Sequence, residues 1–272
     1  MRIYRRFDAF DRGLHVALMV SFLGLAVSGL PLLFSESVWA SRLAHALGGF
    51  QAAGMVHRTS AVVLIGVFLA HLGRVGKRLV VDRDVSVLWG PASMTPQPRD
   101  LRDLFNHMKW FLELGPRPRF DRYTYWEKFD YMAVVWGMGI IGGSGLMLWF
   151  PTLFAHVVPG WVFNVATLIH GEEALLAVGF IFTVHFFNTH MRPGKFPMDA
   201  VIFTGRVTED ELRDERADEY DRLRAGGRLE QEAVGPEPAW VLPLARVLAV
   251  VVLTVGFSVV ALIAITLARS PH

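Results

Sequence analysis

Long apolar runs separated by strongly charged stretches dominate the pattern of hydrophobic and polar positions along the chain. A helix needs roughly 20 apolar residues to cross the hydrocarbon core of a bilayer. Five runs reach that length, and we expect each to form a membrane-spanning helix: 14–34, 51–73, 131–150, 161–190 and 241–268. The first run is too long for the apolar core of a signal peptide, and no small-residue cleavage site follows it, so we expect it to remain as a span.

The stretches between the runs carry charge and helix-breaking residues. Residues 82–122 predict a short amphipathic helix between two proline-marked turns, at the cytoplasmic interface. Residues 205–238 combine oppositely charged side chains at helical spacing with later Gly and Pro, which predicts a surface helix and a linker. The chain is therefore expected to be an all-α integral membrane protein: a four-helix bundle with a fifth transmembrane helix. The predicted boundaries are 1–195 for the four-helix domain with its loop 74–128, 196–239 for the charged segment, and 240–272 for the fifth helix with the C-terminus.

The positions of Lys and Arg predict how the chain is oriented. The chain holds 27 of them, and all lie in 1–12, 74–128 and 192–246 except Arg42, Arg58 and Arg269. Cytoplasmic loops carry such an excess, so we expect a cytoplasmic N-terminus and a periplasmic C-terminus in a bacterial inner membrane. The pI near 9.1 then follows from topology and does not call for a nucleic-acid partner.

Cysteine is absent from the chain, and this excludes several redox centres. Disulfides, covalently attached c-type haem and thiolate-bound iron–sulfur clusters all require cysteine. A redox centre in this chain must use histidine, methionine or carboxylate ligands.

Paired histidines in the second and fourth apolar runs are the main chemical signal. His57 and His71 are fourteen residues apart, and His170 and His185 are fifteen apart. At about 100° and 1.5 Å per residue, each pair lies on roughly one helix face at two depths. Alternating topology makes the two helices parallel, so the outer and inner histidines of one face those of the other. Two stacked bis-imidazole sites predict two b-type haems inside a helical bundle.

Other residues near these histidines have more than one interpretation. Arg58 is expected to pair with a haem propionate, which explains a charge at that depth. The glycine-rich stretch 137–145 fits either room for a haem or close helix packing. His45, His107 and His156 fall in predicted loops and are expected to be solvent-exposed. Apart from the paired histidine spacing, no internal repeat is apparent.

Several stretches resemble a known family. FDRGLHVALMVSFLGLAVSGL, GMVHRTSAVVLI, SGLMLWFP and ATLIHGEEALL resemble the membrane cytochrome b (gamma) subunit of formate dehydrogenases and its relatives in hydrogenases and thiosulfate reductase. The resemblance covers about residues 5–190. The fifth helix and the stretch FFNTHMRPGKFPMD are more similar to cytochrome b domains that accompany periplasmic multihaem c-type cytochromes.

The resemblance implies haem ligands that agree only in part with the histidine spacing. The family's outer haem is held by histidines matching His57 and His170. Its inner haem uses the histidines matching His15 and His185, whereas the spacing within this chain pairs His185 with His71. Both inner pairings stay open. The histidine left over, or His190, is then available for a third haem or for a quinone.

The resemblance also implies a quinone site and a function. The family binds menaquinone beside the inner haem with residues at the start of the third helix, where this chain has Tyr123, Thr124 and Trp126. Trp126 and the neighbouring Tyr125 also fit an interfacial aromatic belt. The expected function is a subunit that transfers electrons between the menaquinone or ubiquinone pool and a periplasmic partner, either a multihaem c-type cytochrome or an iron–sulfur or catalytic subunit. The competing class is a histidine-lined proton or metal transporter, or a non-haem membrane metalloprotein.

Overall fold

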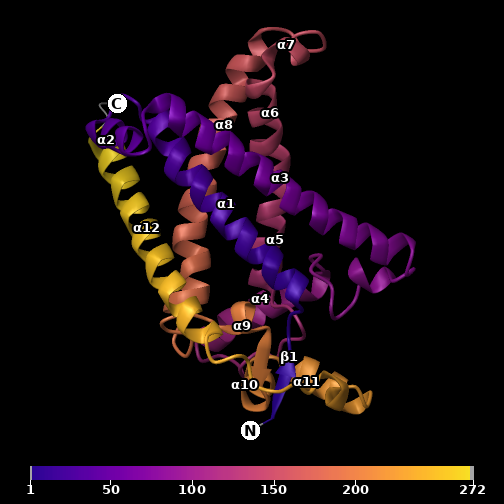
Figure 1. The fold of residues 1–272 in the computed structure, drawn as a ribbon. Coiled ribbons are helices and arrows are strands. Elements are labelled where there is room, and N and C mark those ends of the chain that lie inside the picture. Colours follow the sequence, from indigo (N-terminus) through magenta and orange to yellow (C-terminus); the bar gives the residue numbers. More distant parts are fainter. Residues whose placement is uncertain (1, 270–272) are drawn as a thin grey trace. The chain divides into compact units, whose positions relative to one another are not determined.

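Five long helices dominate the computed structural model, which describes residues 2–269 (Figure 1). By length and composition, five helical segments can cross a membrane: Ala9–Leu33, Phe50–Val80, Tyr125–Trp149, Trp161–Met191 and Val241–Ala268. The five predicted spans are thus confirmed as helices, and the chain has the character of a membrane protein. The second is longer than expected because the helix continues through charged residues beyond the apolar run.

The helices follow one another in a simple order. Their bounds are α1 Ala9–Leu33, α2 Val38–Ala46, α3 Phe50–Val80, α4 Pro98–Phe111, α5 Tyr125–Gly137, α6 Gly143–Trp149, α7 Pro151–Phe154, α8 Trp161–Phe180, α9 Val201–Thr204, α10 Glu209–Glu215, α11 Ala217–Ala225 and α12 Val241–Arg269. Three π-helical turns interrupt the α-helical geometry of the third and fourth spans: Met138–Gly142, Ile181–His185 and Phe187–Met191. Short 3-10 helices cover Val85–Val87 and Leu229–Glu232.

A small sheet departs from the all-α prediction. Strands β1 (Ile3–Arg5) and β2 (Arg206–Thr208) pair antiparallel, with Tyr4 opposite Val207. Three-residue strands are too short to show an alternating pattern in a sequence. The sheet joins the N-terminus to the charged segment that was predicted as a helix and linker.

The chain divides into two compact units that each combine distant segments. Unit 1 contains 1–12, 70–134 and 200–242, and unit 2 contains 13–69, 135–199 and 243–272. Each domain expected from the sequence is one continuous stretch of the chain. Each compact unit, in contrast, contains parts of all three predicted domains. Residues 270–272, which the predicted last domain includes, lie outside the described residues.

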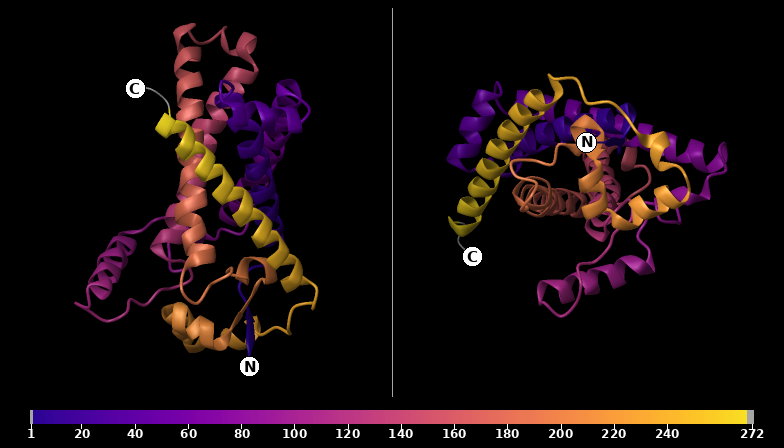
Figure 2. Two further views of the ribbon diagram at one scale, coloured as in Figure 1. Left: turned by 90° about the vertical axis from the view of Figure 1, so that its left-hand side faces the viewer. Right: turned by 90° about the horizontal axis from the view of Figure 1, so that it is seen from below.

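The core of unit 2 lies where α1, α8 and α12 pack together (Figures 1 and 2). It contains Ala26, Leu30, Val178, Phe182, Phe186, Val252 and Val259. Gly256 of α12 faces the rings of Phe182 and Phe186, and a Cβ at this glycine would lie 2.6 Å from Phe186. The fifth span therefore packs closely against the fourth through a residue that has no side chain.

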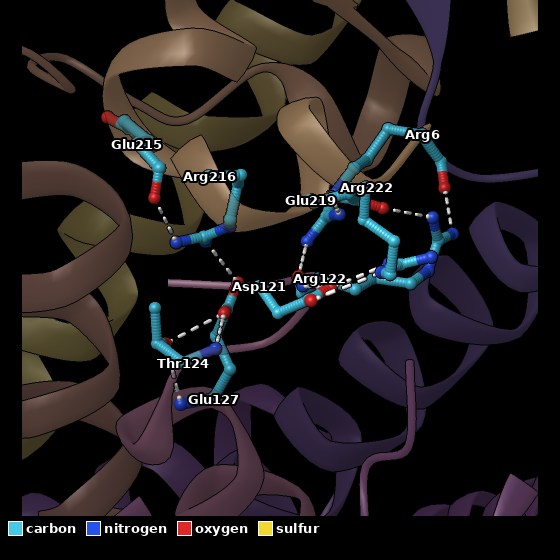
Figure 3. Close-up of polar contacts among 9 residues, drawn as sticks. All are labelled: Arg6, Asp121, Arg122, Thr124, Glu127, Glu215, Arg216, Glu219 and Arg222. Atoms are coloured by element: carbon cyan, nitrogen blue, oxygen red, sulfur yellow. Dashed lines mark hydrogen bonds and ion pairs between the residues drawn. The ribbon is translucent and has the colours of Figure 1, made fainter. Parts of the chain in front are cut away.

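Unit 1 has its own small core and a buried ionic network (Figure 3). Its hydrophobic cluster contains Tyr4, Val207, Leu212, Tyr220 and Leu229. Beside it, Glu219 accepts from Arg6 Nη1 at 2.5 Å and from Arg122 Nη1 at 2.9 Å. The side chains of Arg6 and Glu219 are only 5% and 3% exposed. Further pairs join Arg222 to Asp121 at 2.6 Å and Arg216 to Glu127 at 2.8 Å.

Replacing Glu219 by Gln is expected to destabilise unit 1 strongly. Two buried or half-buried guanidinium groups would lose their carboxylate, and breaking a buried pair costs about 3–5 kcal/mol. Glu230→Gln is the matched control, because its pair with Arg2 is 64–70% exposed and such pairs contribute about 0–1 kcal/mol. Unfolding of the detergent-solubilised variants measures both. Equal effects of the two substitutions would contradict the assigned role of the network.

Candidate functional site

The structure brings the rings of His57 of α3 and His170 of α8 close together within unit 2. Their ring centres are 6.2 Å apart and their planes meet at 80°. The two histidines come from different spans, so this is a tertiary contact. It matches the outer of the two pairings expected from the histidine spacing.

The surroundings of His170 fix which ring nitrogen is available. Its Nδ1 lies 3.0 Å from the carbonyl oxygen of Ile141 and 3.3 Å from Ser144 Oγ. The Ser144 hydroxyl donates to the carbonyl of Ile140 at 2.7 Å, so its lone pairs face the imidazole. We therefore assign the proton of the neutral ring to Nδ1, which leaves the lone pair on Nε2.

His57 has the same kind of surroundings, provided by α1. Its Nδ1 lies 3.5 Å from Ser28 Oγ, and the ring also hydrogen-bonds the backbone of Leu25. The Ser28 hydroxyl donates to the carbonyl of Gly24 at 2.5 Å, so it too presents lone pairs to the ring. Both imidazoles are thus oriented by a carbonyl and a serine of a neighbouring span.

A glycine lies against each ring. A Cβ at Gly29 would approach His57 Cε1 to 2.9 Å, and a Cβ at Gly145 would approach His170 Cε1 to 2.9 Å. Because real Cβ atoms essentially never come that close, each imidazole occupies space that only glycine leaves open. The serine–glycine dipeptides 28–29 and 144–145 therefore form a matched pair of cradles for the two rings.

The two cradles belong to an internal repeat that the sequence analysis missed. The stretch SGLPLLF at 28–34 corresponds to SGLMLWF at 144–150. Displaced by the same number of residues along the chain, FDRGLH at 10–15 corresponds to WEKFDY at 126–131. Both stretches begin with an aromatic, an acidic and a basic residue, and the last residue is His in the first stretch and Tyr in the second. The first span thus corresponds to the third. The histidine pairs relate the second span to the fourth in the same way.

A π-helical turn accounts for the unequal spacing of those pairs. His170 and His185 are one residue further apart than His57 and His71, and the turn Ile181–His185 lies between them in α8's continuation. A π-turn accommodates an additional residue in a helix and is frequent at functional sites. His185 of the fourth span therefore corresponds to His71 of the second.

The three inner histidines and Tyr131 fall into two pairs, His15 with His185 and His71 with Tyr131, which are related by the repeat. In unit 2 the charge of His185 acts on both His15 and His190. In unit 1 His71 Nε2 lies 3.0 Å from the hydroxyl of Tyr131, and the ring centres are 5.6 Å apart. Since Tyr131 corresponds to His15 in the repeat, one pair offers two imidazoles and the other an imidazole and a phenol.

Arg74, which follows His71 on α3, forms an ion pair with acidic residues at the start of the first span. Arg74, one turn further, pairs with Asp8 at 2.5 Å and with Asp11 at 3.2 Å. The hydrogen bond from Arg74 lowers the pKa of the Asp8 carboxyl to about 2. Asp8 therefore stays ionised, and this ion pair stays intact, well below neutral pH.

The remaining predicted site residues have varied surroundings. Arg58 is exposed, with its guanidinium 6.0 Å from the centre of the Trp149 ring. His190 is buried, and its Nδ1 lies 3.1 Å from the carbonyl of Pro197. The roles predicted for both residues toward haem or quinone stay predictions.

The residues expected to contact quinone already have partners within unit 1. Thr124 is fully buried, and its backbone N–H and hydroxyl both donate to Glu127 at 2.7 Å, as in a capping box at the start of α5. Tyr123 lies under the guanidinium groups of Arg6 and Arg122. Trp126 is part of an aromatic cluster around His107. Their predicted contacts with quinone stay predictions.

His107 itself corrects an expectation. It was predicted to lie exposed in a loop, but it is in α4 and is half-buried, with its Nδ1 3.1 Å from the Tyr125 hydroxyl. His45 also lies in a helix, α2, and is exposed as expected, while His156 is an exposed turn residue. Tertiary contacts with aromatic residues explain the burial of His107.

Comparison with known proteins finds no family model that matches this chain and no curated protein that matches it. Within residues 2–269, no group of three or more His, Asp or Glu side chains converges as a metal site. What the site offers is pairs of imidazoles. The function is therefore argued from the geometry of those pairs.

Proposed function

We propose that the chain is a membrane b-type cytochrome subunit that holds two haem b groups. It carries electrons across a bacterial inner membrane, between the menaquinone or ubiquinone pool and a periplasmic redox partner. That partner is a multihaem c-type cytochrome or an iron–sulfur or catalytic subunit. The observation that carries the proposal is the pairing of His57 with His170 in a site built to orient both rings.

The separation of these two rings fits a shared metal ion. A metal–imidazole nitrogen bond is about 2.0 Å long and the ring nitrogen lies about 1.1 Å from the ring centre, so two axial imidazoles have centres about 6.3 Å apart. The observed separation is 6.2 Å. A haem supplies the other four iron ligands itself, so a pair of imidazoles is a sufficient donor set.

The cradles support the same assignment. A histidine that ligates a metal usually donates its other ring N–H to a carbonyl, a carboxylate or a water. Nδ1 of His170 lies near a backbone oxygen and a serine oxygen, and Nδ1 of His57 lies near a serine oxygen, which leaves Nε2 of each as the proposed ligand atom. When bound, a haem iron accepts and releases one electron at a time, and these residues hold and orient it.

For the inner haem we propose His15 and His185 as the ligands. Both are histidines of unit 2, and the resemblance to the formate dehydrogenase subunit implies the same pair. His71 has its Nε2, the usual ligand atom, within hydrogen-bond distance of Tyr131. The repeat supports this choice, because the position equivalent to the His15–His185 pair contains a tyrosine in place of one imidazole.

The visible spectrum of the purified protein, recorded before and after addition of a quinol, tests the proposed function. We expect the sharp alpha and Soret bands of a reduced b-type haem to appear on reduction by the quinol. A colourless protein would contradict haem binding and favour a proton or metal transporter. A coloured protein that dithionite reduces but no quinol reduces would contradict the link to the quinone pool.

Removing the two serine hydroxyls is expected to weaken haem binding at the outer site. The double variant Ser28→Ala, Ser144→Ala loses one acceptor at each Nδ1, and such outer hydrogen bonds change metal affinity by about 10–100-fold. The ligands become less basic, so the midpoint potential of the outer haem should rise. Ser21→Ala is the control, because Ser21 is buried in α1 and bonds to backbone carbonyls without contacting a histidine in the described bonds. Haem titration and a redox titration measure the two effects, and identical values for all three proteins would contradict the role of the cradles.

A further inference from the structure

The acidic residues of helix α4 are buried within unit 1. Asp100 and Asp103 are 9% and 7% exposed, although acidic residues of a surface helix usually face water. Lys128 of α5, itself buried, donates to both carboxylate oxygens of Asp100 at 2.8 and 3.0 Å. The acidic side of this amphipathic helix is therefore the side that packs against the rest of unit 1.

Aromatic contacts hold α4 in this orientation. The ring of His107 lies 5.4 Å from the centre of Trp126 and 5.7 Å from that of Phe120, and its Nδ1 is 3.1 Å from the Tyr125 hydroxyl. These contacts lie on the same side of the helix as Asp100 and Asp103. Together with the buried ion pair, they prevent α4 from rotating about its axis to hide its other side.

The opposite side of α4 is apolar and exposed. Leu101, Phe105, Met108 and Leu112 are 59%, 54%, 51% and 66% exposed, and their spacing of four, three and four residues places them in one stripe. The stripe is flanked by cations, because Arg102 and Lys109 follow its members and are exposed. Since both acids of α4 are buried, the exposed charge of this helix is positive.

We propose that α4 lies in the headgroup region of the bilayer, with the stripe 101, 105, 108 and 112 inserted and with Arg102 and Lys109 binding anionic phospholipid headgroups. An in-plane helix of this kind combines a buried apolar face with basic residues at its border. The position in the chain fits, because α3 ends at Val80 and α5 begins at Tyr125, so α4 is tethered at both ends to spanning helices. The proposal does not depend on haem and goes beyond the proposed function.

The absence of cysteine from the chain allows a direct test of insertion. Single cysteines placed by Phe105→Cys and Met108→Cys carry nitroxide labels on the stripe, and Asn106→Cys carries one on the polar border as the matched control. The whole protein is reconstituted in nanodiscs that contain phosphatidylglycerol. We expect labels at 105 and 108 to be more accessible to oxygen, which concentrates in lipid, than to a water-soluble nickel complex, and the label at 106 to show the reverse. Equal access to the nickel complex at all three positions would overturn the proposal, because the stripe would then face water.

A second comparison tests the choice of anionic lipid. The label at 105 is expected to lie deeper in nanodiscs with phosphatidylglycerol than in nanodiscs of phosphatidylcholine alone. Arg102→Gln combined with Lys109→Gln should abolish this difference, whereas Arg224→Gln combined with Arg228→Gln, which removes exposed cations elsewhere in unit 1, should keep it. Equal depth in the two lipids for the protein without charge substitutions would overturn the assignment of headgroup binding. Both measurements read label depth alone, so they stand or fall independently of the haem content.

Discussion

Replacing either His57 or His170 by alanine is expected to remove one of two haems from each chain while the other remains. The two rings are proposed to hold one iron between them, and losing one axial imidazole leaves the other without its counterpart. Haem per chain should fall by half in each variant. The double variant should lose no more haem than either single one, because both residues serve the same site.

Controls for this experiment come from histidines at the surface. His45→Ala and His156→Ala change exposed residues of unit 2 that lie outside the proposed sites. Both variants should keep the full haem content and the same spectrum. If His57→Ala and His170→Ala also kept it, the outer haem site would be elsewhere in the chain.

The second large effect distinguishes the two candidates for the inner ligand. His15→Ala is expected to eliminate the inner haem, and His71→Ala is expected to keep both haems, because His15 and His185 are the proposed ligands. His71 instead contacts Tyr131 through a ring nitrogen. Haem quantification with a redox titration tells which of the two potentials disappears.

The opposite result has an equally clear meaning. Loss of the inner haem in His71→Ala, with retention in His15→Ala, would assign the inner ligand to the histidine that the spacing within the chain favours. Tyr131→Phe serves as an additional control, since it removes the phenol that contacts His71 and leaves every histidine in place. It should keep both haems.

Most of the fold could be predicted because membrane spans leave a strong signal. A run of apolar residues long enough to cross a bilayer has few alternatives to a helix, and all five runs are helical in the structure. The pairing of β1 with β2 and the ionic network of Glu219 were not predictable. Both join the N-terminus to residues beyond position 200. Local sequence patterns do not predict contacts between segments so far apart in the chain.

The approach of His57 to His170 was predictable, but the surroundings of the two rings were not. The spacing of His57 and His170 relative to their inner counterparts indicated the outer pair, because helical periodicity fixes which residues share a face. The same periodicity could not separate His15 from His71, since His15 lies near the start of the first span and His71 near the end of the second. The contact that favours His15 is the one made by its competitor, because Nε2 of His71 lies 3.0 Å from the Tyr131 hydroxyl.

The serine–glycine cradles show what a closer reading of the sequence could have found. SGLPLLF and SGLMLWF are visible as a repeat, and glycine next to serine in two spans is a signal for a close approach. What the repeat alone does not show is that each cradle faces a histidine of another span. That knowledge requires the contacts of Gly29 with His57 and of Gly145 with His170.

Haem per chain in the purified protein, determined from the pyridine haemochrome spectrum and the protein concentration, tests the central claim most directly. The account predicts two haem b groups per chain after expression with ample haem supply. A protein that contains none under those conditions would contradict it, because the imidazole pairs would then serve some purpose other than holding iron porphyrin.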